Sequence, residues 1–198
     1  MMFTTIVILL LTQGRPAIDV DLSEQITPVR QTSTNTCWAS VATMLVSWRD
    51  GKPYTIIEAM ADAGEEYARA FENNRPLMGT DKDRFLAALR VEAEAPQDFS
   101  LSGWVDLLRK YGPLWVTTEG PGDVFSVHAI LVTGIYGDGS PTGTRFRYVD
   151  PLGGLRKTET LQLIMDRFDA VGRADMGKDR RGDFRPQVVH ASPRSKLP

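Results

Sequence analysis

The chain has 198 residues, and 42% of them are hydrophobic, which is enough apolar material for the core of one globular domain. Lysine and arginine number 23 against 25 aspartate and glutamate residues, so the formal net charge is −2. This balance argues against a protein that binds nucleic acid or an anionic membrane through its overall charge. A single cysteine cannot form an internal disulfide, and with only two histidines a structural zinc site is disfavoured. We therefore expect no cofactor and no need for an oxidising compartment.

The N-terminal stretch carries a short apolar run, Ile6–Thr12, which is too short to cross a bilayer. No longer apolar stretch follows, so we expect no membrane span. The run fits the core of a signal peptide, although no basic residue precedes it and no clear small-residue cleavage site follows. An edge strand or a domain boundary is the alternative. Residues 16–24 are polar and turn-like, and we assign 1–24 to an N-terminal segment or linker.

The next segment predicts a helix that begins at the single cysteine. Apolar residues recur at the helical period over Trp38–Trp48, Gly51 follows, and Asn35 and Thr36 are natural N-cap residues. Cys37 would then lie in the first turn, where free N–H groups and the helix dipole favour a thiolate. A lone cysteine is more often a small buried hydrophobe, so its position alone does not establish a nucleophile.

Three more helical patterns follow. We expect one helix over 55–71, a second that starts near Thr80, and a third from Ser100 or Ser102 to Tyr111, where Gly112 ends it. Their apolar and aromatic side chains recur at helical spacing, which is typical of core packing rather than of a ligand site.

The pattern then changes to strands. Residues 114–118 form a short β-rich run, and 125–136 form the strongest strand of the chain. A turn-rich stretch at 137–143 separates this strand from another over 144–150. We expect the last two strands to pair as an antiparallel hairpin.

His128 and Asp150 lie at equal distances from the centre of that turn, so we expect them to be cross-strand neighbours within hydrogen-bonding range. A carboxylate on one ring nitrogen fixes the orientation of a histidine and leaves the other nitrogen to exchange a proton with a nucleophile. Taken singly, each residue also has a structural reading, the histidine as a core or edge residue and the aspartate before proline as a strand end.

Beyond Leu155 we expect a last helix over 157–171. Residues 172–198 then form a basic tail rich in proline and glycine, with seven lysine or arginine residues. We expect a solvated end in which His190 has no catalytic part, with a docking or nucleic-acid role for the tail as the alternative.

These residues together resemble a papain-like cysteine peptidase. Gln31 stands six residues before Cys37 and its following tryptophan, His128 opens a strand, and Asp150 closes the next strand. The likeness is to compact bacterial forms, namely the avirulence-effector peptidases of plant pathogens and related toxins, with bacteriocin-processing peptidases as more distant relatives. It covers roughly residues 29–155. The chain departs from papain in lacking the disulfide next to the nucleophile and in having aspartate where papain has asparagine.

The resemblance implies an α+β, papain-like fold, in which an N-terminal helical part that carries the cysteine helix packs on a C-terminal antiparallel sheet, with the peptidase domain at 25–171. In mechanism, Cys37 would attack the peptide carbonyl, and His128 would be its ion-pair partner and general acid. Asp150 would hold the ring, and a charged partner should raise the His128 pKa more than asparagine does. Gln31 and the Cys37 backbone N–H would form the oxyanion hole.

The expected function is a thiol protease that cleaves protein or peptide substrates, secreted or translocated as an effector or toxin into a target-cell cytoplasm, or otherwise cytoplasmic. A toxin of this kind would imply a cognate immunity or inhibitor protein. Another acyl-transfer enzyme with the same triad (a deamidase, transglutaminase or peptidoglycan amidase) and a peptide-processing peptidase remain alternatives. A catalytically silent binding module is disfavoured, because all four expected site residues are present.

Overall fold

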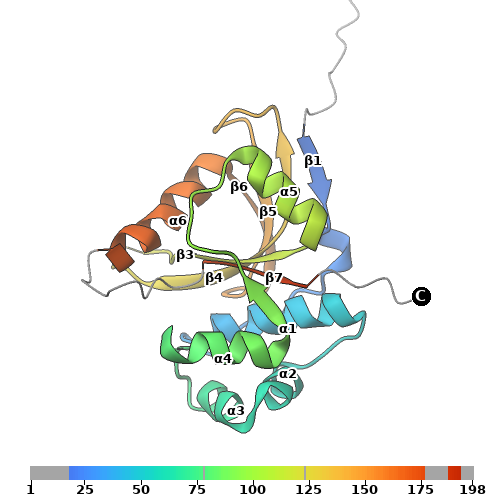
Figure 1. Ribbon diagram of the computed structural model, residues 1–198, viewed down its shortest axis with the longest axis vertical. Helices are drawn as coiled ribbons and strands as arrows, with labels where there is room; N and C mark the ends of the chain where they lie inside the picture. The colour runs from blue at the N-terminus through green and yellow to red at the C-terminus, as the bar shows by residue number, and fades with distance from the viewer. Residues whose placement is uncertain (1–17, 78, 123, 177–186, 193–198) are drawn as a thin grey trace, which may run out of the picture.

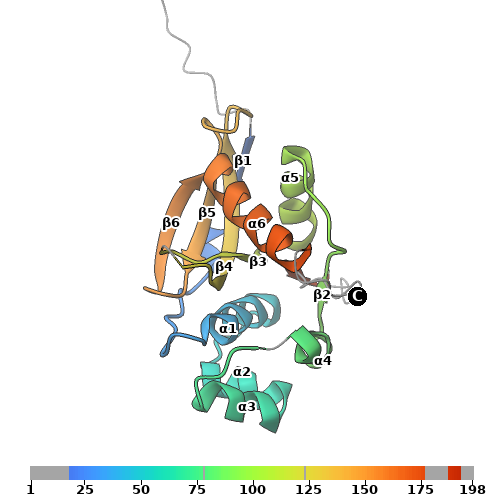
Figure 2. The same ribbon diagram turned by 90° about the vertical axis from the view of Figure 1, so that its left-hand side faces the viewer.

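In the part of the chain that the structure describes, seven antiparallel strands form one sheet with helices against both faces (Figures 1 and 2). The computed structural model describes residues 18–77, 79–122, 124–176 and 187–192. The expected α+β architecture, with the cysteine helix packed against an antiparallel sheet, is confirmed. The apolar run at residues 6–12 lies outside the described residues.

The strands are hydrogen-bonded in the spatial order β2-β7-β3-β4-β5-β6, and β1 pairs with β4 beside this path. Every pair is antiparallel. The bounds are β1 Ile18–Asp21, β2 Val91–Ala93, β3 Leu114–Glu119, β4 Val127–Gly137, β5 Arg145–Asp150, β6 Leu155–Thr160 and β7 Val188–Ala191.

The helices divide into two groups that cover opposite faces of the sheet. Their bounds are α1 Cys37–Asp50, α2 Ile56–Ala63, α3 Glu65–Glu72, α4 Gly79–Leu89, α5 Leu101–Tyr111 and α6 Leu161–Met176, and a 3₁₀ turn spans Ser23–Gln25. Along β3, Trp115 packs into the apolar cluster of α1–α4, whereas its neighbours Leu114 and Val116 pack into the cluster of α5 and α6. This alternation is what a strand with two buried faces produces.

The helix expected over 55–71 is two helices in the structure. Thr55 caps α2 in a reciprocal capping box with Glu58, and α2 ends at Gly64, whose φ is +139°. That backbone conformation favours glycine and interrupts the helix. The apolar period continues across the break, which is why the sequence pattern predicts one helix.

The helix expected over 157–171 starts later than expected, because residues 155–160 form β6 against β5. The β6 sequence, LRKTET, contains only one apolar residue, so it has no strong period of its own. Helix α6 begins at Leu161 and buries Ile164, Phe168 and Val171.

Two further strands lie outside the domain limits expected from sequence. Strand β1 comes from the stretch expected to be polar and turn-like, and it pairs with β4. Strand β7 comes from the expected tail, and it lies between β2 and β3 in the sheet. Val188, Val189, His190 and Ala191 are all buried. The expectation of a solvated tail is therefore wrong for 188–191, because four residues in a polar context give too short a pattern to identify a strand.

In the part of the chain that the structure describes, no helix combines the length and the apolar character that crossing a membrane requires.

Candidate active site

Helix α1 begins at Cys37, as expected, and the side chain of Cys37 is partly exposed. Thr36 is the N-cap residue, but its side chain does not cap the helix. Its hydroxyl instead donates to the Ser33 carbonyl (2.9 Å) and accepts from the Ser33 N–H (3.2 Å). Thr36 therefore shapes the loop before the cysteine, and the first turn of α1 receives no side-chain cap.

Trp38, directly after the cysteine, has a packing role in the structure. Its side chain is buried, meets Phe85 edge to face, and donates from Nε1 to the Arg75 carbonyl (3.2 Å). These contacts fix the start of α1 against α4 and the loop before it.

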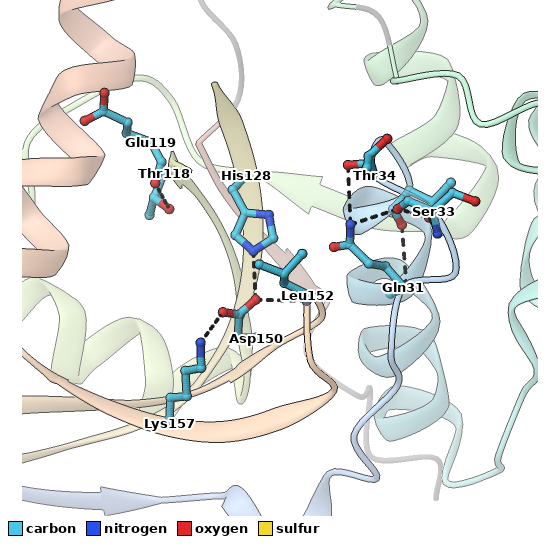
Figure 3. A network of polar contacts seen from close by, with 11 residues as sticks. Gln31, Ser33, Thr34, Thr118, Glu119, His128, Asp150, Leu152 and Lys157 are labelled. Atoms are coloured by element: carbon cyan, nitrogen blue, oxygen red, sulfur yellow. Dashed lines mark hydrogen bonds and ion pairs between the residues drawn. The ribbon is translucent and has the colours of Figure 1, made fainter. Parts of the chain in front are cut away.

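His128 and Asp150 lie in direct hydrogen-bond contact, 2.8 Å apart between Nε2 and Oδ1 (Figure 3). The expected proximity is confirmed, but the expected register is wrong. Leu131 pairs with Val149, so the same register continued by one step sets Asp150 opposite Ile130. The two side chains are thus diagonal neighbours on one face of the sheet, a separation that long side chains bridge.

Among the described residues, Asp150 receives three hydrogen bonds. Besides the contact with His128, Oδ1 accepts from the Leu152 N–H (3.0 Å), and Oδ2 accepts from Lys157 Nζ (2.7 Å). Burial of the carboxyl group raises its pKa, but the hydrogen bonds from His128, Lys157 and Leu152 outweigh this and hold the pKa of Asp150 well below its usual range. Asp150 is therefore a carboxylate at any physiological pH.

The ring of His128 interacts with both Asp150 and Cys37. Burial lowers its pKa, but hydrogen bonds with Asp150 and with Cys37 outweigh burial and raise the pKa of His128 to about 9. The hydrogen bond to Asp150 uses Nε2, which leaves Nδ1 as the ring nitrogen available to Cys37. At neutral pH the ring is therefore an imidazolium that can stabilise a thiolate on Cys37.

Gln31 lies at this site, but its amide has other partners. The side chain is buried, Nε2 donates to the Ser33 (2.8 Å) and Thr34 (3.3 Å) carbonyls, and Oε1 is buried without a hydrogen-bond partner among the described residues (Figure 3). Its backbone N–H donates to the Pro151 carbonyl (2.8 Å). Gln31 thus ties the cysteine loop to the residue after Asp150, while its amide donors are held by that loop.

Lys157 is a polar neighbour of Asp150 that is not expected from the sequence, since it lies at the start of an expected helix. The sequence does contain a local signal. Gly153 and Gly154 follow Asp150 and Pro151, a composition that indicates a turn, and a run of mostly polar residues comes next. Reading that turn as a second hairpin places Lys157 on the strand next to Asp150. Within the described ranges, no group of three or more histidine, cysteine, aspartate or glutamate side chains is arranged to hold a metal ion.

Comparison with protein families finds a family for most of the chain. The model of the family described as papain-like cysteine protease AvrRpt2 matches residues 16–169. The matched segment contains Cys37, His128 and Asp150, and it also contains β1. No curated protein matches the chain.

Proposed function

The chain belongs to the family of the papain-like cysteine protease AvrRpt2 and is a cysteine peptidase, and on that premise we propose that Cys37, His128 and Asp150 form its catalytic triad. One observation carries the proposal: His128 Nε2 lies 2.8 Å from Asp150 Oδ1, and Cys37, at the start of α1, lies near enough to the same ring to raise its pKa. This is the arrangement in which a thiol is activated and its histidine is oriented.

In the proposed reaction, the Cys37 thiolate attacks the scissile carbonyl carbon and forms a tetrahedral oxyanion. The intermediate collapses to a thioester as the His128 imidazolium gives its proton to the leaving amine. A water then attacks the thioester and gives its proton to the neutral His128. Release of the carboxylic acid product restores the thiolate and the imidazolium. Asp150 stays ionised throughout and holds the ring.

The oxyanion hole is proposed to contain the Cys37 backbone N–H and the Gln31 amide. The first donor lies at the uncapped start of α1. The second must leave the Ser33 or Thr34 carbonyl when substrate binds, because the Gln31 Nε2 donates to both in this structure. One donor of this kind contributes about 3 kcal/mol of transition-state stabilisation.

We further propose that the protein acts as a translocated effector or toxin in the cytoplasm of a target cell, on protein substrates, and that a cognate inhibitor protein covers its active site. Membership of the AvrRpt2 family supports the effector role. A single cysteine without a disulfide also suits a reducing cytosol. The family supports a peptidase over the deamidase, transglutaminase and amidase alternatives.

The test combines a thiol-directed epoxide probe with a proteome-derived peptide library. We expect the wild type to be labelled at Cys37 and to cut the library at defined sites, and Cys37→Ala and His128→Ala to do neither. Undiminished labelling of His128→Ala at neutral pH would show that Cys37 is merely accessible. Labelling without peptide cleavage, together with ammonia release from glutamine side chains, would support the deamidase alternative instead.

A further inference from the structure

Three charged or titratable side chains form a diagonal row across neighbouring strands of the sheet. Lys157 on β6 is paired with Tyr148 on β5, and Asp150 lies two residues after Tyr148, so both side chains point to the same face. Asp150 is in turn diagonal to His128 on β4. The row is joined by contacts of 2.7 Å, from Lys157 to Asp150, and 2.8 Å, from Asp150 to His128 (Figure 3).

The contacts of Asp150 are divided between its two oxygens. One oxygen accepts from His128 and from the Leu152 N–H, and the other accepts from Lys157. The Asp150 side chain is 8% exposed and the Lys157 side chain 41% exposed, so the ammonium group covers the solvent side of a buried carboxylate. A charge-assisted hydrogen bond in such a setting restricts rotation of the carboxylate plane.

We propose that Lys157 is a positioning residue of this peptidase, whose ammonium group holds the second oxygen of Asp150 so that the first stays directed at His128. The inference rests on the proposed triad, because it assigns Lys157 its role through Asp150. Lys157 itself need not contact the substrate or the reacting atoms.

The same contact balances the charge of the site. Thiolate, imidazolium and carboxylate sum to one negative charge, and the Lys157 ammonium brings the sum to zero. The titratable groups that face Asp150 are His128 on β4, Lys157 on β6 and the Tyr148 phenol on β5. Burial, Glu159 and Asp150 raise the pKa of Tyr148 to about 12 although Arg167 on α6 opposes them, so this phenol stays neutral. Lys157 is therefore the group that offsets the carboxylate on the side away from His128.

Removal of the ammonium leaves the Asp150 charge unbalanced and raises the pKa of His128 further, by about half a unit for a partly exposed charge of this kind. A less acidic imidazolium protonates the leaving amine more slowly. A purely structural role for Lys157 would lower activity equally at every pH and leave the titration of His128 unchanged. The two roles are thus separable by a measurement on the ring itself.

The experiment is an NMR titration of the imidazole resonances, which is practical because the full chain has two histidines. The titration compares the wild type with Lys157→Met, Lys157→Gln and Lys157→Arg. The control is Lys52→Met, which also removes one ammonium group but lies beyond the end of α1 that is far from Cys37. We expect the His128 midpoint to rise by about half a unit in the Met and Gln variants and kcat to fall about two- to threefold. The Arg variant should return both values toward wild type, and Lys52→Met should change neither.

The inference is overturned if Lys157→Met and Lys157→Gln keep the wild-type midpoint and kcat while cleavage still depends on Cys37 and His128. If kcat falls while the His128 midpoint stays constant, and Lys157→Arg does not restore kcat, Lys157 has only a structural role. If the wild type shows no hydrolysis that depends on Cys37 and His128, the triad fails instead. Thermal unfolding of each variant identifies any loss of fold.

Discussion

At the residue scale, the decisive property of the site is the charge of His128. Its ring lies between a carboxylate and a thiol, and both contacts favour the protonated form despite burial. The proposed mechanism uses that proton twice, first to stabilise the thiolate and then to release the amine. Activity should therefore be lost when the ring loses its proton, and this sets the alkaline limit of the enzyme.

We expect kcat/KM to hold up to about pH 8 and to fall with a midpoint near 9, the pKa of His128. Asp150→Asn removes the charge that supports the imidazolium while the ring remains buried, so its midpoint should move to lower pH. The measurement is kcat/KM for a cleaved peptide across the pH range. An unchanged midpoint in Asp150→Asn would contradict the assignment of the alkaline limb to His128.

Gln31→Ala separates the oxyanion role from the loop contacts of the same side chain. We expect kcat to fall about 10²- to 10³-fold, because one oxyanion donor is lost. Alkylation of Cys37 by iodoacetamide forms no oxyanion, so its rate should stay close to that of the wild type. A parallel fall in both rates would mean that Gln31 acts through the Ser33 and Thr34 carbonyls that it holds in place.

At the element scale, the junction between α5 and β3 passes close to the end of α1. Gly112 ends α5 with φ +84°, and a Cβ at this position would meet the Trp48 ring. We expect Gly112→Ala to lower the free energy of unfolding by about 2 to 4 kcal/mol through backbone strain and overpacking. Gly79→Ala in α4 is the control, since a Cβ there meets nothing within 4 Å.

Chemical denaturation of both variants measures the difference. If Gly112→Ala is as stable as Gly79→Ala, α5 and α1 can move apart at low cost in free energy. The close packing of Trp48 against Gly112 argues against this outcome.

The elements predicted correctly from sequence are those whose signals are local. Helix α1 begins at Cys37, where its apolar period starts, although Thr36 at the N-cap position provides no side-chain cap. Helix α5 has both signals, an apolar period and the capping side chain of Ser100. The pairing of His128 with Asp150 follows from one hairpin with dense turn chemistry, although its register is shifted. The Lys157 contact depends on a second hairpin, which only the turn at Gly153 and Gly154 indicates in the sequence. The orientation of the Gln31 amide depends on the conformation of the loop at Ser33 and Thr34, which no apolar period specifies.

At the scale of the whole molecule, the sheet is completed by strands that lie far apart in the sequence. Strand β7 lies between β2 and β3, so residues near the C-terminal end of the described chain complete the surface on which α1 packs. Its valines are buried on both faces, Val188 with the α5 and α6 cluster and Val189 with the α1 cluster. We therefore propose that the folding unit extends from β1 to β7 rather than over 25–171.

Two truncations test this limit. A chain that ends after Gln187 lacks β7, exposes unpaired edges on β2 and β3, and loses the buried valines. We expect it to lose cooperative thermal unfolding and epoxide labelling of Cys37, because the packing that positions α1 needs the completed sheet. A chain that ends after Ser192 keeps β7 and should retain both properties. Cooperative unfolding of the shorter chain would place the domain boundary before β7. If the chain that ends after Ser192 unfolds cooperatively but is inactive, residues 193–198 have a role in function instead.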